Sequence, residues 1–584
     1  MTYNQSNKKN KKWNIIILLL SIFGLIVCIT LLFPQTRQIV LDWAIQVLHK
    51  EPFSYEASLK LLLSLASGGI CFILFFDYCT LTNSGKALSQ QVIQEIKDCL
   101  SEIDFKVFIK PVLLMFGIYL LGVFTIIRAN FLYEDDIACS ITGIRRWYDW
   151  NRYVVMFLSY IIHPEIRITD ISPIPQLLAA LVLSCSSVIL VYIIGKKKIT
   201  SVRLLASISL GLSPFFLECL SYKFDSPYMA LSILSCIIPF LFITRKRAFF
   251  FISVVSLIIM CMTYQVAAST YIMIVIILCF QDWNNRKKTD KEILSFLGMA
   301  AVAFCFSMLL FKFFIMKSFD SDDYYTSTKM YSIIHFLPGV LNNIKNYAMT
   351  INQDLGVIWK IGIALVCVFF IAKSVYISSR NKILSFILSF FVIVISFIIS
   401  YGLYLLLEKP LYAPRALNGF GVFLALLCVF VVSNYKKIAT IAVLALNWCF
   451  FVFAFSYGNA LADQARYAKF REGLLLHDLN TLYIDHNNGD MSIQLKNTID
   501  YTPTIKNIAK HNPIIERLVP IRLGETKSYW EHRYFMDHYN YNPNVTYINP
   551  LDVDFDSMDL PVVLDSYYHT IKSDGEHILV ILKH

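Results

Sequence analysis

Three consecutive acidic residues, Glu134, Asp135 and Asp136, directly follow an apolar run in the segment Phe131-Leu-Tyr-Glu-Asp-Asp-Ile137. A carboxylate at a predicted membrane edge is costly to desolvate and therefore indicates a functional site. A carboxylate within hydrogen-bond reach of a hydroxyl group can remove its proton. Adjacent side chains point in different directions, so we expect one of the two aspartates to be a catalytic base and the other, like Glu134, to orient a basic residue or bind substrate. Solvated loop acids are the alternative.

Five basic residues fall in the same set of predicted loops as these acids: Arg145, Arg146, Arg152, Lys223 and Arg415. A lipid-linked phosphate at the membrane rim would need such groups, and arginine binds phosphate through two parallel hydrogen bonds. We therefore expect these residues to bind substrate. Snorkelling of each side chain to lipid headgroups is the alternative.

Other polar residues give weaker signals. Asp225, close to Lys223, is expected either to pair with it or to bind sugar hydroxyl groups. Asp320, Asp322 and Asp323 would suit a cation site, although a solvated acidic loop explains them better. The histidines have no HExxH spacing, so no metal site is predicted. A divalent cation is compatible with the chain but not indicated, and no cofactor is expected. Because there is no Walker loop, the energy for any reaction must arrive with an activated substrate.

The elements that position these residues are predominantly membrane-spanning helices. The chain is 57% hydrophobic and only 16% charged, and its apolar residues come in runs of about 20, the length that crosses a bilayer. Because the net charge of +11 falls in short clusters between these runs, nucleic acid is not an expected partner. About thirteen spans of this kind are predicted, at residues 14–33, 58–81, 109–128, 174–195, 202–220, 227–244, 248–263, 266–281, 294–316, 355–377, 383–407, 415–434 and 438–456.

Lysine and arginine clusters occupy every second loop of this arrangement, at residues 196–198, 245–247, 286–288, 380–382 and 436–437. Because these residues favour cytoplasmic loops, the clusters and the basic N-terminus are expected inside. The acids at 134–136, the five candidate basic residues and everything after residue 457 are then outside. The apolar stretch 248–281 is broken only by Thr263-Tyr-Gln265, and charge bias favours a hairpin there over one long helix.

Two polar stretches are predicted to form surface helices. Residues 84–107 have apolar positions at helical spacing and are expected on the cytoplasmic surface. In the first large outer loop, the residues that recur at helical spacing are Trp147, Trp150, Val154, Phe157, Leu158 and Ile161. This predicts an interfacial helix with the arginines of the loop on its other face, and it makes Trp147 a further substrate-binding candidate.

After Tyr457 the composition becomes that of a soluble protein. Short β-like runs at 481–485, 561–564 and 577–582 alternate with helix-like stretches such as 504–517. The expected fold is therefore an all-α polytopic membrane protein with a small C-terminal α+β domain. Its expected units are an N-terminal extension (1–108) with two spans and a surface helix, a membrane body (109–456) and an outer domain (457–584).

Seven segments resemble signatures of a known family: Tyr133 to Ile137, Thr142 to Arg152, Ile168 to Pro175, Ser221 to Ser232, Ala413 to Leu417, Tyr457 to Gln464 and Asp559 to Val563. The family is that of the type II glucosyltransferases, bacterial inner-membrane enzymes that decorate O-antigen. The resemblance runs in order from about residue 109 to the C-terminus. The first 108 residues look like an addition, and Cys139 stands where a basic residue is expected.

The resemblance implies a GT-C-type enzyme with its active site on the periplasmic side. The donor would be undecaprenyl-phosphate glucose or a related hexose, which a donor synthase makes and a flippase turns outward. The acceptor would be a sugar hydroxyl on a lipid-linked O-antigen intermediate. One aspartate would act as the base, and the cations would hold the departing polyprenyl phosphate. A polyprenyl-linked sugar flippase or transporter, and a related transferase that modifies lipid A or teichoic acid, are the alternatives.

Overall fold

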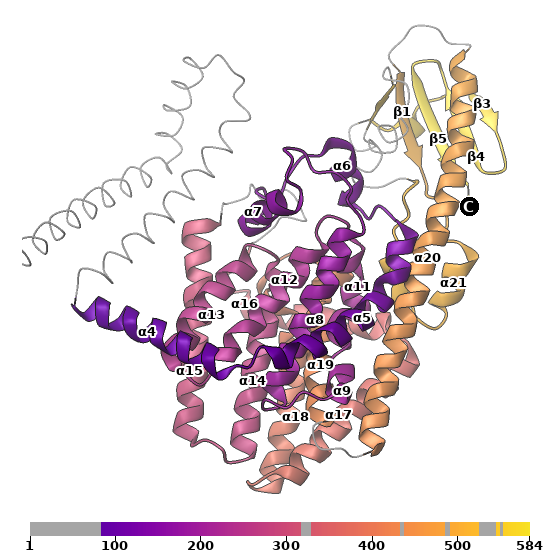
Figure 1. Cartoon of the computed structure of the whole chain (residues 1–584). Helices are drawn as coiled ribbons and strands as arrows, with labels where there is room; N and C mark the ends of the chain where they lie inside the picture. The colour runs from indigo at the N-terminus through magenta and orange to yellow at the C-terminus, as the bar shows by residue number, and fades with distance from the viewer. Residues whose placement is uncertain are drawn as a thin grey trace, which may run out of the picture.

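The computed structural model describes residues 83–316, 329–432, 437–484, 491–524, 545–548 and 553–583. Its larger part is a bundle of helices, and its longest helix carries a small sheet at one end of that bundle (Figure 1). The expected spans 14–33 and 58–81 lie outside the described residues, as do Asp320, Asp322 and Asp323.

Eight helices among the described residues are long and apolar enough to cross a membrane. They are α5 (Lys106–Ala129), α8 (Ile174–Ile194), α14 (Ala268–Asn284) with η2 (Gln265–Ala267), α15 (Asp290–Leu310) with the π-helical turn η3 (Phe311–Ile315), α17 (Val357–Ile377), α18 (Lys382–Ile399), α19 (Gly419–Val431) with η5 (Pro414–Leu417), and α20 (Lys437–Ile484). These elements confirm a predominantly helical, polytopic membrane protein.

Two shorter apolar elements match further expected spans. They are α12 (Ser226–Ile237) with η1 (Ile238–Phe242), and α13 (Lys246–Cys261). The helix ends at Cys261 and the next element begins at Gln265, so the hairpin predicted within 248–281 is confirmed.

The span expected at 202–220 is broken. The helices α9 (Ser201–Ala206) and α10 (Ser209–Leu212) meet α11 (Pro214–Ser221) at an angle of 62°. Ser213 between them is extended, with ψ 146°, and Pro214 has no N–H group to continue the helical hydrogen bonds. The apolar segment expected at 202–220 is therefore present as a bent pair of helices and not as one continuous helix. The residue that follows α11, Tyr222, contacts Glu134.

The helix α19 forms the centre of the bundle. Every residue from Gly419 to Val431 is buried, as expected for a helix that is hydrophobic on all faces. Peripheral helices instead leave large apolar side chains exposed, among them Leu121, Phe313, Ile358 and Phe386. Such a surface on spanning helices is the one that faces lipid.

The surface helix predicted at residues 84–107 is present as α4 (Asn83–Glu102). It packs against the start of α13, where Arg247 pairs with Glu95 at 3.0 Å and Arg245 pairs with Glu102 at 3.3 Å. Three more ion pairs join the basic loops after α8, α14 and α17: Lys196 with Asp282, Lys288 with Asp282, and Arg380 with Asp290. These three basic clusters therefore meet on one side of the molecule.

The helices α5 and α20 pack closely because residue 458 is glycine. A Cβ atom on Gly458 would lie 2.4 Å from the hydroxyl oxygen of Thr125 and 2.5 Å from its backbone carbonyl carbon. The same hydroxyl group donates a hydrogen bond of 3.2 Å to the carbonyl of Ala454. The two helices thus meet backbone to backbone just before the end of α5.

We expect Gly458→Ala to lower the free energy of unfolding by about 1–3 kcal/mol, because the added methyl group overpacks this contact. Thermal unfolding of the purified protein in detergent measures the effect. Gly473→Ala is the matched control, since residue 473 is on the same helix and nothing lies within 4 Å of its Cβ position. Equal unfolding temperatures for the two variants would contradict the expectation.

The helix α20 continues without a break across the expected domain boundary at 456/457 and ends only at Ile484. Beyond it lies a five-stranded sheet in the order β2 (Val545–Tyr547), β1 (Met491–Lys496), β5 (His577–Leu582), β4 (His569–Ser573), β3 (Val562–Asp565), with the short helix η7 (Phe555–Ser557). The strand β1 is parallel to both of its neighbours, and β3, β4 and β5 are antiparallel.

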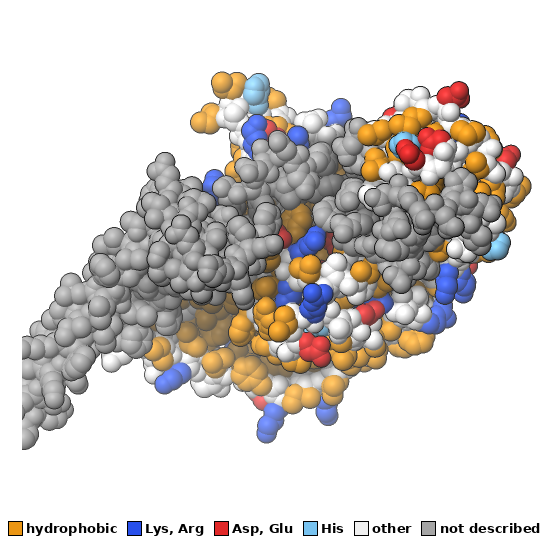
Figure 2. Space-filling model, turned by 90° about the horizontal axis from the view of Figure 1, so that it is seen from above, with side chains coloured by type: hydrophobic (Ala, Val, Ile, Leu, Met, Phe, Trp, Pro, Cys, Tyr) orange, Lys and Arg blue, Asp and Glu red, His pale blue; other side chains and the backbone are white. Residues whose placement is uncertain are grey.

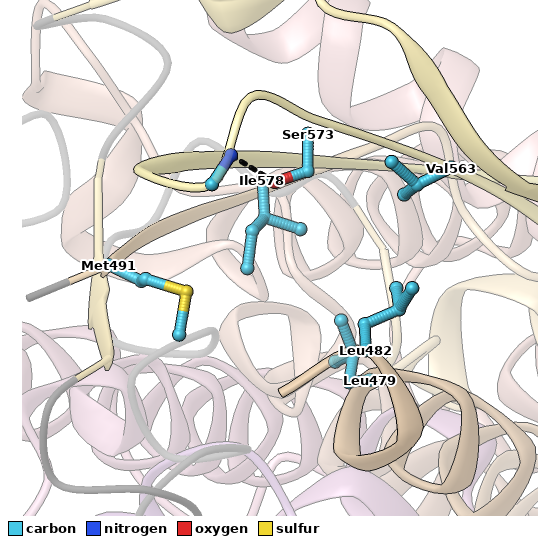
Figure 3. A pocket seen from close by; sticks show the side chains of 7 residues that line it. Leu479, Leu482, Met491, Val563, Ser573 and Ile578 are labelled. Atoms are coloured by element: carbon cyan, nitrogen blue, oxygen red, sulfur yellow. Dashed lines mark hydrogen bonds between the residues drawn. The ribbon is translucent and has the colours of Figure 1, made fainter. Parts of the chain in front are cut away.

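The sheet packs on the end of α20. Ala468, Leu475 and Leu479 of the helix form a hydrophobic core with the strands, and a small apolar crevice remains beside Leu479 and Leu482 (Figure 3). The strands expected at 561–564 and 577–582 are present. The strand expected at 481–485 is wrong, because residues 481–484 continue the helix whose side chains at helical spacing cover the sheet.

The stretch 504–517 forms two helices, α21 (Pro503–Ala509) and α22 (Ile514–Leu518). Their apolar side chains, including Ile505, Ile514 and Leu518, are buried in the core of the membrane body and not in that of the sheet. A further helix, α16 (Phe336–Asp354), packs along η4 (Gly402–Leu406), and Asn343 donates hydrogen bonds to the carbonyls of Leu405 and Leu407. Leu518 of α22 accepts a hydrogen bond from Tyr133, which lies just before α6 (Asp135–Thr142); α7 (Tyr153–Ile162) follows α6 in the chain.

Candidate functional site

The acidic segment lies between the end of α5 and the start of α6. Asn130 ends α5 in the left-handed conformation with φ 47°. Glu134 has φ 41° and ψ −106°, a conformation that costs a residue with a side chain about 1–3 kcal/mol. Strained backbone of this kind gathers at functional sites, and here it directs consecutive carboxylates to different partners.

Asp136 holds the loops together. Its carboxylate is buried and accepts hydrogen bonds from the backbone N–H of Tyr133 at 2.9 Å and of Lys223 at 3.0 and 3.1 Å. Burial raises the pKa of this carboxyl well above its usual range, and the two backbone N–H groups oppose that shift. Asp136 thus joins the segment before α6 to the loop before α12 and is enclosed by protein.

Asp135 is exposed, and no described residue donates a hydrogen bond to it or forms an ion pair with it. The surrounding protein and the charge of Glu134 raise its pKa, and Arg415 and Arg152 oppose that shift. A raised pKa makes the carboxylate a stronger base than an ordinary aspartate. The geometry therefore favours Asp135 over Asp136 as an acceptor of a proton.

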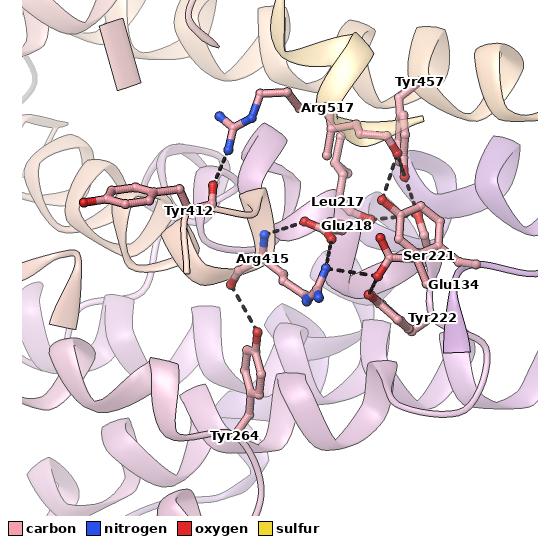
Figure 4. Close-up of polar contacts among 12 residues, drawn as sticks. Glu134, Leu217, Glu218, Ser221, Tyr222, Tyr264, Tyr412, Arg415, Tyr457 and Arg517 are labelled. Atoms are coloured by element: carbon pink, nitrogen blue, oxygen red, sulfur yellow. Dashed lines mark hydrogen bonds and ion pairs between the residues drawn. The ribbon is translucent and has the colours of Figure 1, made fainter. Parts of the chain in front are cut away.

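Arg415 is held between two carboxylates (Figure 4). Its Nη1 lies 3.3 Å from Glu134 and also bonds Glu218, which accepts a second hydrogen bond from the Arg415 backbone N–H. Tyr222 donates a hydrogen bond of 2.8 Å to Glu134, and its ring centre is 5.7 Å from the guanidinium carbon. The Arg415 side chain remains 20% exposed, so a fixed guanidinium group is open to an anion. A basic residue is expected at position 139 to pair with the acidic segment, and Arg415 provides that basic partner in place of Cys139.

Glu218 is a site residue that the sequence interpretation does not single out. It lies on α11 in an otherwise apolar run and is almost fully buried. A carboxylate inside a membrane-spanning run is itself a signal of function, so the residue could have been found. Its partner could not, because Arg415 is 197 positions away in the chain.

Asp225 and Arg152 form a second ion pair beside this cluster. The Asp225 carboxylate accepts a hydrogen bond of 2.7 Å from the indole N–H of Trp147 and lies 3.7 Å from Arg152. The Arg152 guanidinium lies 5.3 Å from the ring centre of Tyr264, whose hydroxyl donates to the Arg415 carbonyl at 3.4 Å. Tyr264 therefore links the two ion pairs into one polar surface.

Lys223 is buried, and its ammonium group contacts other residues of the protein. Its ammonium group lies 2.6 Å from both Asn130 and Asp170. Although burial raises the pKa of Asp170, hydrogen bonds from Lys223 and Ser172 bring it below its usual range. The ion pair ties together the segments before α6, α8 and α12, so Lys223 supports the site and does not present its charge to a ligand.

Arg145 is also buried. Its guanidinium group donates hydrogen bonds to the carbonyls of His163 and Glu165, each at 2.7 Å, and to that of Ile166, and it stacks 4.1 Å above the ring of Tyr160. It thereby closes the loop after α7, and most of its donors are occupied.

The interfacial helix predicted from Trp147 onward begins only at Tyr153, as α7. Trp147 is buried against Tyr228, with ring centres 5.7 Å apart, and precedes the helix. The predicted start is therefore wrong, because this tryptophan precedes the helix and its side chain is buried against Tyr228. Arg146 is exposed on the outer surface.

The C-terminal part of the chain supports the cluster from a further side. The hydroxyl groups of Tyr133 and Tyr457 donate hydrogen bonds to the carbonyl of Leu518, at 2.9 and 3.3 Å. Arg517 bonds the carbonyl of Tyr412, in the loop that leads to η5 (Figure 4). The segment that carries Glu134 and the loop before Arg415 are thus both anchored to α22.

The arrangement places the exposed Asp135 carboxylate near the partly exposed Arg415 guanidinium group. Figure 2 views this end of the molecule, where Lys, Arg, Asp and Glu side chains lie among hydrophobic ones. Among the described residues, no group of three or more His, Cys, Asp or Glu side chains could hold a metal ion. Glu134, Glu218 and Asp225 contact arginine instead, which leaves the Asp135 carboxylate and the exposed part of Arg415 accessible.

Comparison with known proteins assigns the family. The model of the family described as Glucosyl transferase GtrII matches residues 124–432, more than half of the chain. A protein of Salmonella phage P22, described as an uncharacterized 55.3 kDa protein in the gtrB 5′ region, is 24% identical over 428 residues, which cover 69% of this chain and 85% of the phage protein. No solved structure matches. The matched region contains both the acidic segment and Arg415, and the chain belongs to the GtrII family of glucosyl transferases, which makes it a membrane glycosyltransferase.

Proposed function

We propose that this protein moves glucose, or a related hexose, from undecaprenyl-phosphate-hexose to a sugar hydroxyl of a lipid-linked O-antigen or a similar surface polysaccharide. The observation that carries the proposal is the free Asp135 carboxylate beside the immobilised, partly exposed Arg415 guanidinium. Membership of the family supports the choice of glucose and of O-antigen.

In the proposed reaction the acceptor oxygen attacks the anomeric carbon of the donor. A new glycosidic bond forms as the bond from that carbon to the phosphate oxygen breaks, and Asp135 takes the proton of the acceptor hydroxyl. The electron pair of the broken bond stays with the departing polyprenyl phosphate, whose charge Arg415 stabilises. A preorganised group of this kind contributes about 10²- to 10³-fold to the rate. Inversion turns a β-linked donor into an α-glycoside.

The proposed location of the site is the periplasmic face of the bacterial inner membrane. The basic clusters at 196–198, 286–288 and 380–382 meet through ion pairs on one side of the molecule. Basic clusters favour the cytoplasmic side, and the loops that alternate with them carry the acidic segment and Arg415. A donor presented there requires a synthase and a flippase as pathway partners.

One observation favours a second candidate function, movement of a polyprenyl-linked sugar across the membrane. The bent pair of α10 and α11 and the buried Glu218 resemble the broken helices and buried charges of transporters. Glu218 is, however, neutralised by Arg415 and belongs to the same cluster as Glu134. The broken helix is therefore better explained as the element that delivers a carboxylate to the transferase site.

A reconstitution experiment tests the proposed function. Purified protein is incorporated into liposomes with synthetic polyprenyl-phosphate glucose and a lipid-linked acceptor, and the product is identified by mass and by linkage analysis. Formation of an α-glucoside supports the proposal. Appearance of the donor in the opposite leaflet, with no new glycosidic bond, would support the transporter instead. In cells, the comparison is of O-antigen composition and linkage with and without the gene.

The pKa of Asp135 predicts the pH dependence of the reaction. A base acts in its deprotonated form, so kcat/KM should fall as the pH drops through the pKa of Asp135, which lies above the ordinary aspartate value. Glu134 contributes to that shift, and Glu134→Gln should move the acid midpoint of the profile to lower pH. The measurement is kcat/KM against pH for both proteins; an unchanged midpoint would argue against Asp135 as the titrating base.

A further inference from the structure

A polar groove lies outside the site described above, where the end of α5, the middle of α20 and the start of α21 meet. The groove is lined by Arg128, Asn459, Ala462, Asp463, Arg466 and Thr504. It begins just beyond the last apolar residues of α5 and next to Tyr457 of α20. Its depth is therefore that of the lipid headgroups next to these helices.

Among the residues that the structure describes, the two arginines of the groove have few hydrogen-bond partners. Arg128 donates from one nitrogen to the Asn459 side chain, and Arg466 pairs with Asp463 at 2.9 Å. The Arg466 side chain is 75% exposed, and no other described residue bonds either guanidinium group. Each guanidinium carries five N–H donors, so several remain for an anion. Two arginines and one aspartate leave a net positive charge.

Below the groove the same two helices present apolar side chains outward. On α5 these include Leu121 and Phe124, which are 58% and 52% exposed, at helical spacing from Arg128. On α20 they include Trp448 and Val452, which lie at helical spacing from Asn459 and Arg466. Two apolar stripes thus lead along the seam of α5 and α20 to one basic, hydrogen-bonding groove.

We propose that this groove binds the phosphate headgroup of an anionic phospholipid, whose acyl chains lie along the seam of α5 and α20. Arginine binds phosphate oxygens through paired N–H donors, and basic pockets between spanning helices select anionic headgroups. The bound lipid is separate from the sugar donor, because the groove lies on the outer side of α5 and α20 and includes neither Asp135 nor Arg415. The Asn459 side-chain amide N–H groups add a polar contact for the rest of the headgroup, whereas the Thr504 hydroxyl hydrogen-bonds Asp463.

Native mass spectrometry of the full-length protein in detergent tests this site. The probes are phosphatidylglycerol, phosphatidylcholine and inorganic phosphate, added at equal concentrations. We expect retention of one phosphatidylglycerol in preference to phosphatidylcholine. In Arg128→Gln/Arg466→Gln the apparent affinity should fall roughly 30-fold, which corresponds to about 1 kcal/mol for each arginine near an anionic lipid. Lys97→Gln/Lys345→Gln is the matched control, because it also removes two positive charges from exposed positions on other helices.

Each outcome decides for or against the proposal. Preference for phosphatidylglycerol that the arginine variant loses and the lysine variant keeps supports it. Equal retention of the two lipids, or equal losses in the two variants, would overturn it. Displacement of the lipid by inorganic phosphate at similar concentration would show that the apolar side chains of α5 and α20 add nothing to the affinity. That result would overturn a site for a phospholipid. In a further titration with polyprenyl phosphate, replacement of bound phosphatidylglycerol at a much lower concentration would assign the groove to the substrate and overturn the separate lipid site.

Discussion

Replacement of Asp135 by asparagine is expected to abolish hexose transfer while leaving the amount of folded protein in the membrane unchanged. The exposed carboxylate makes no contact that the fold needs, so its loss removes only the proposed base. Loss of a general base lowers the rate by about 10²- to 10⁴-fold. The measurement is the initial rate of transfer from a synthetic polyprenyl-phosphate sugar, normalised to purified protein.

Asp136→Asn is the matched comparison, since the same chemical change is made one residue away. An amide offers one acceptor oxygen where the carboxylate receives the N–H groups of Tyr133 and Lys223. A buried donor left without a partner costs about 1–3 kcal/mol, so this variant should unfold at a lower temperature. Full activity of Asp135→Asn would remove this residue from the mechanism. Loss of activity with normal stability in Asp136→Asn would instead move the base to residue 136.

Replacement of Arg415 by glutamine is expected to produce two separate losses. Donor use should fall by about 10²- to 10³-fold, because the group that stabilises the departing phosphate is gone. The free energy of unfolding should also fall by about 3–5 kcal/mol, because Glu218 would be left as a buried charge without its partner. The measurements are kcat/KM for the donor and thermal unfolding in detergent.

The double variant Glu218→Gln/Arg415→Gln separates these two losses. With both charges replaced by amides, the unfolding temperature should return toward that of the unchanged protein. The loss of transfer should remain. Recovery of activity together with stability would show that Arg415 supports the fold alone and would contradict its proposed contact with the phosphate.

The membrane helices could be predicted from the sequence because their signal is local. An apolar run of sufficient length identifies a span without knowledge of its neighbours, and α5, α8, α17 and α18 lie close to where they are predicted. The bend before α11 also has a local cause, because Pro214 interrupts the helical hydrogen bonds and is visible in the sequence. The strand expected at 481–485 fails for the opposite reason, since its residues are held in a helix by contacts with distant strands.

The candidate site could be predicted as a group of residues but not as a set of contacts. The acids and arginines come from loops that fold together, so the sequence places them on one side. It does not reveal that Lys223 is paired with Asp170 or that carbonyl groups surround Arg145. Burial and pairing depend on partners far away in the chain, so the sequence does not distinguish the enclosed charges from the exposed Asp135 and the partly exposed Arg415.

The unbroken helix α20 fixes the orientation of the C-terminal sheet relative to the acidic segment, because both contact side chains of the same helix. At one point it contributes Tyr457 to the support of the acidic segment, and further along Leu475 and Leu479 face the sheet. Each residue inserted between these points would turn the sheet by about 100° and move it outward by about 1.5 Å. Changes of about seven residues, close to two full turns, would restore the orientation. The number of residues in α20 between these two contacts is therefore constrained, and insertions or deletions are compatible with both contacts only when they amount to nearly whole helical turns.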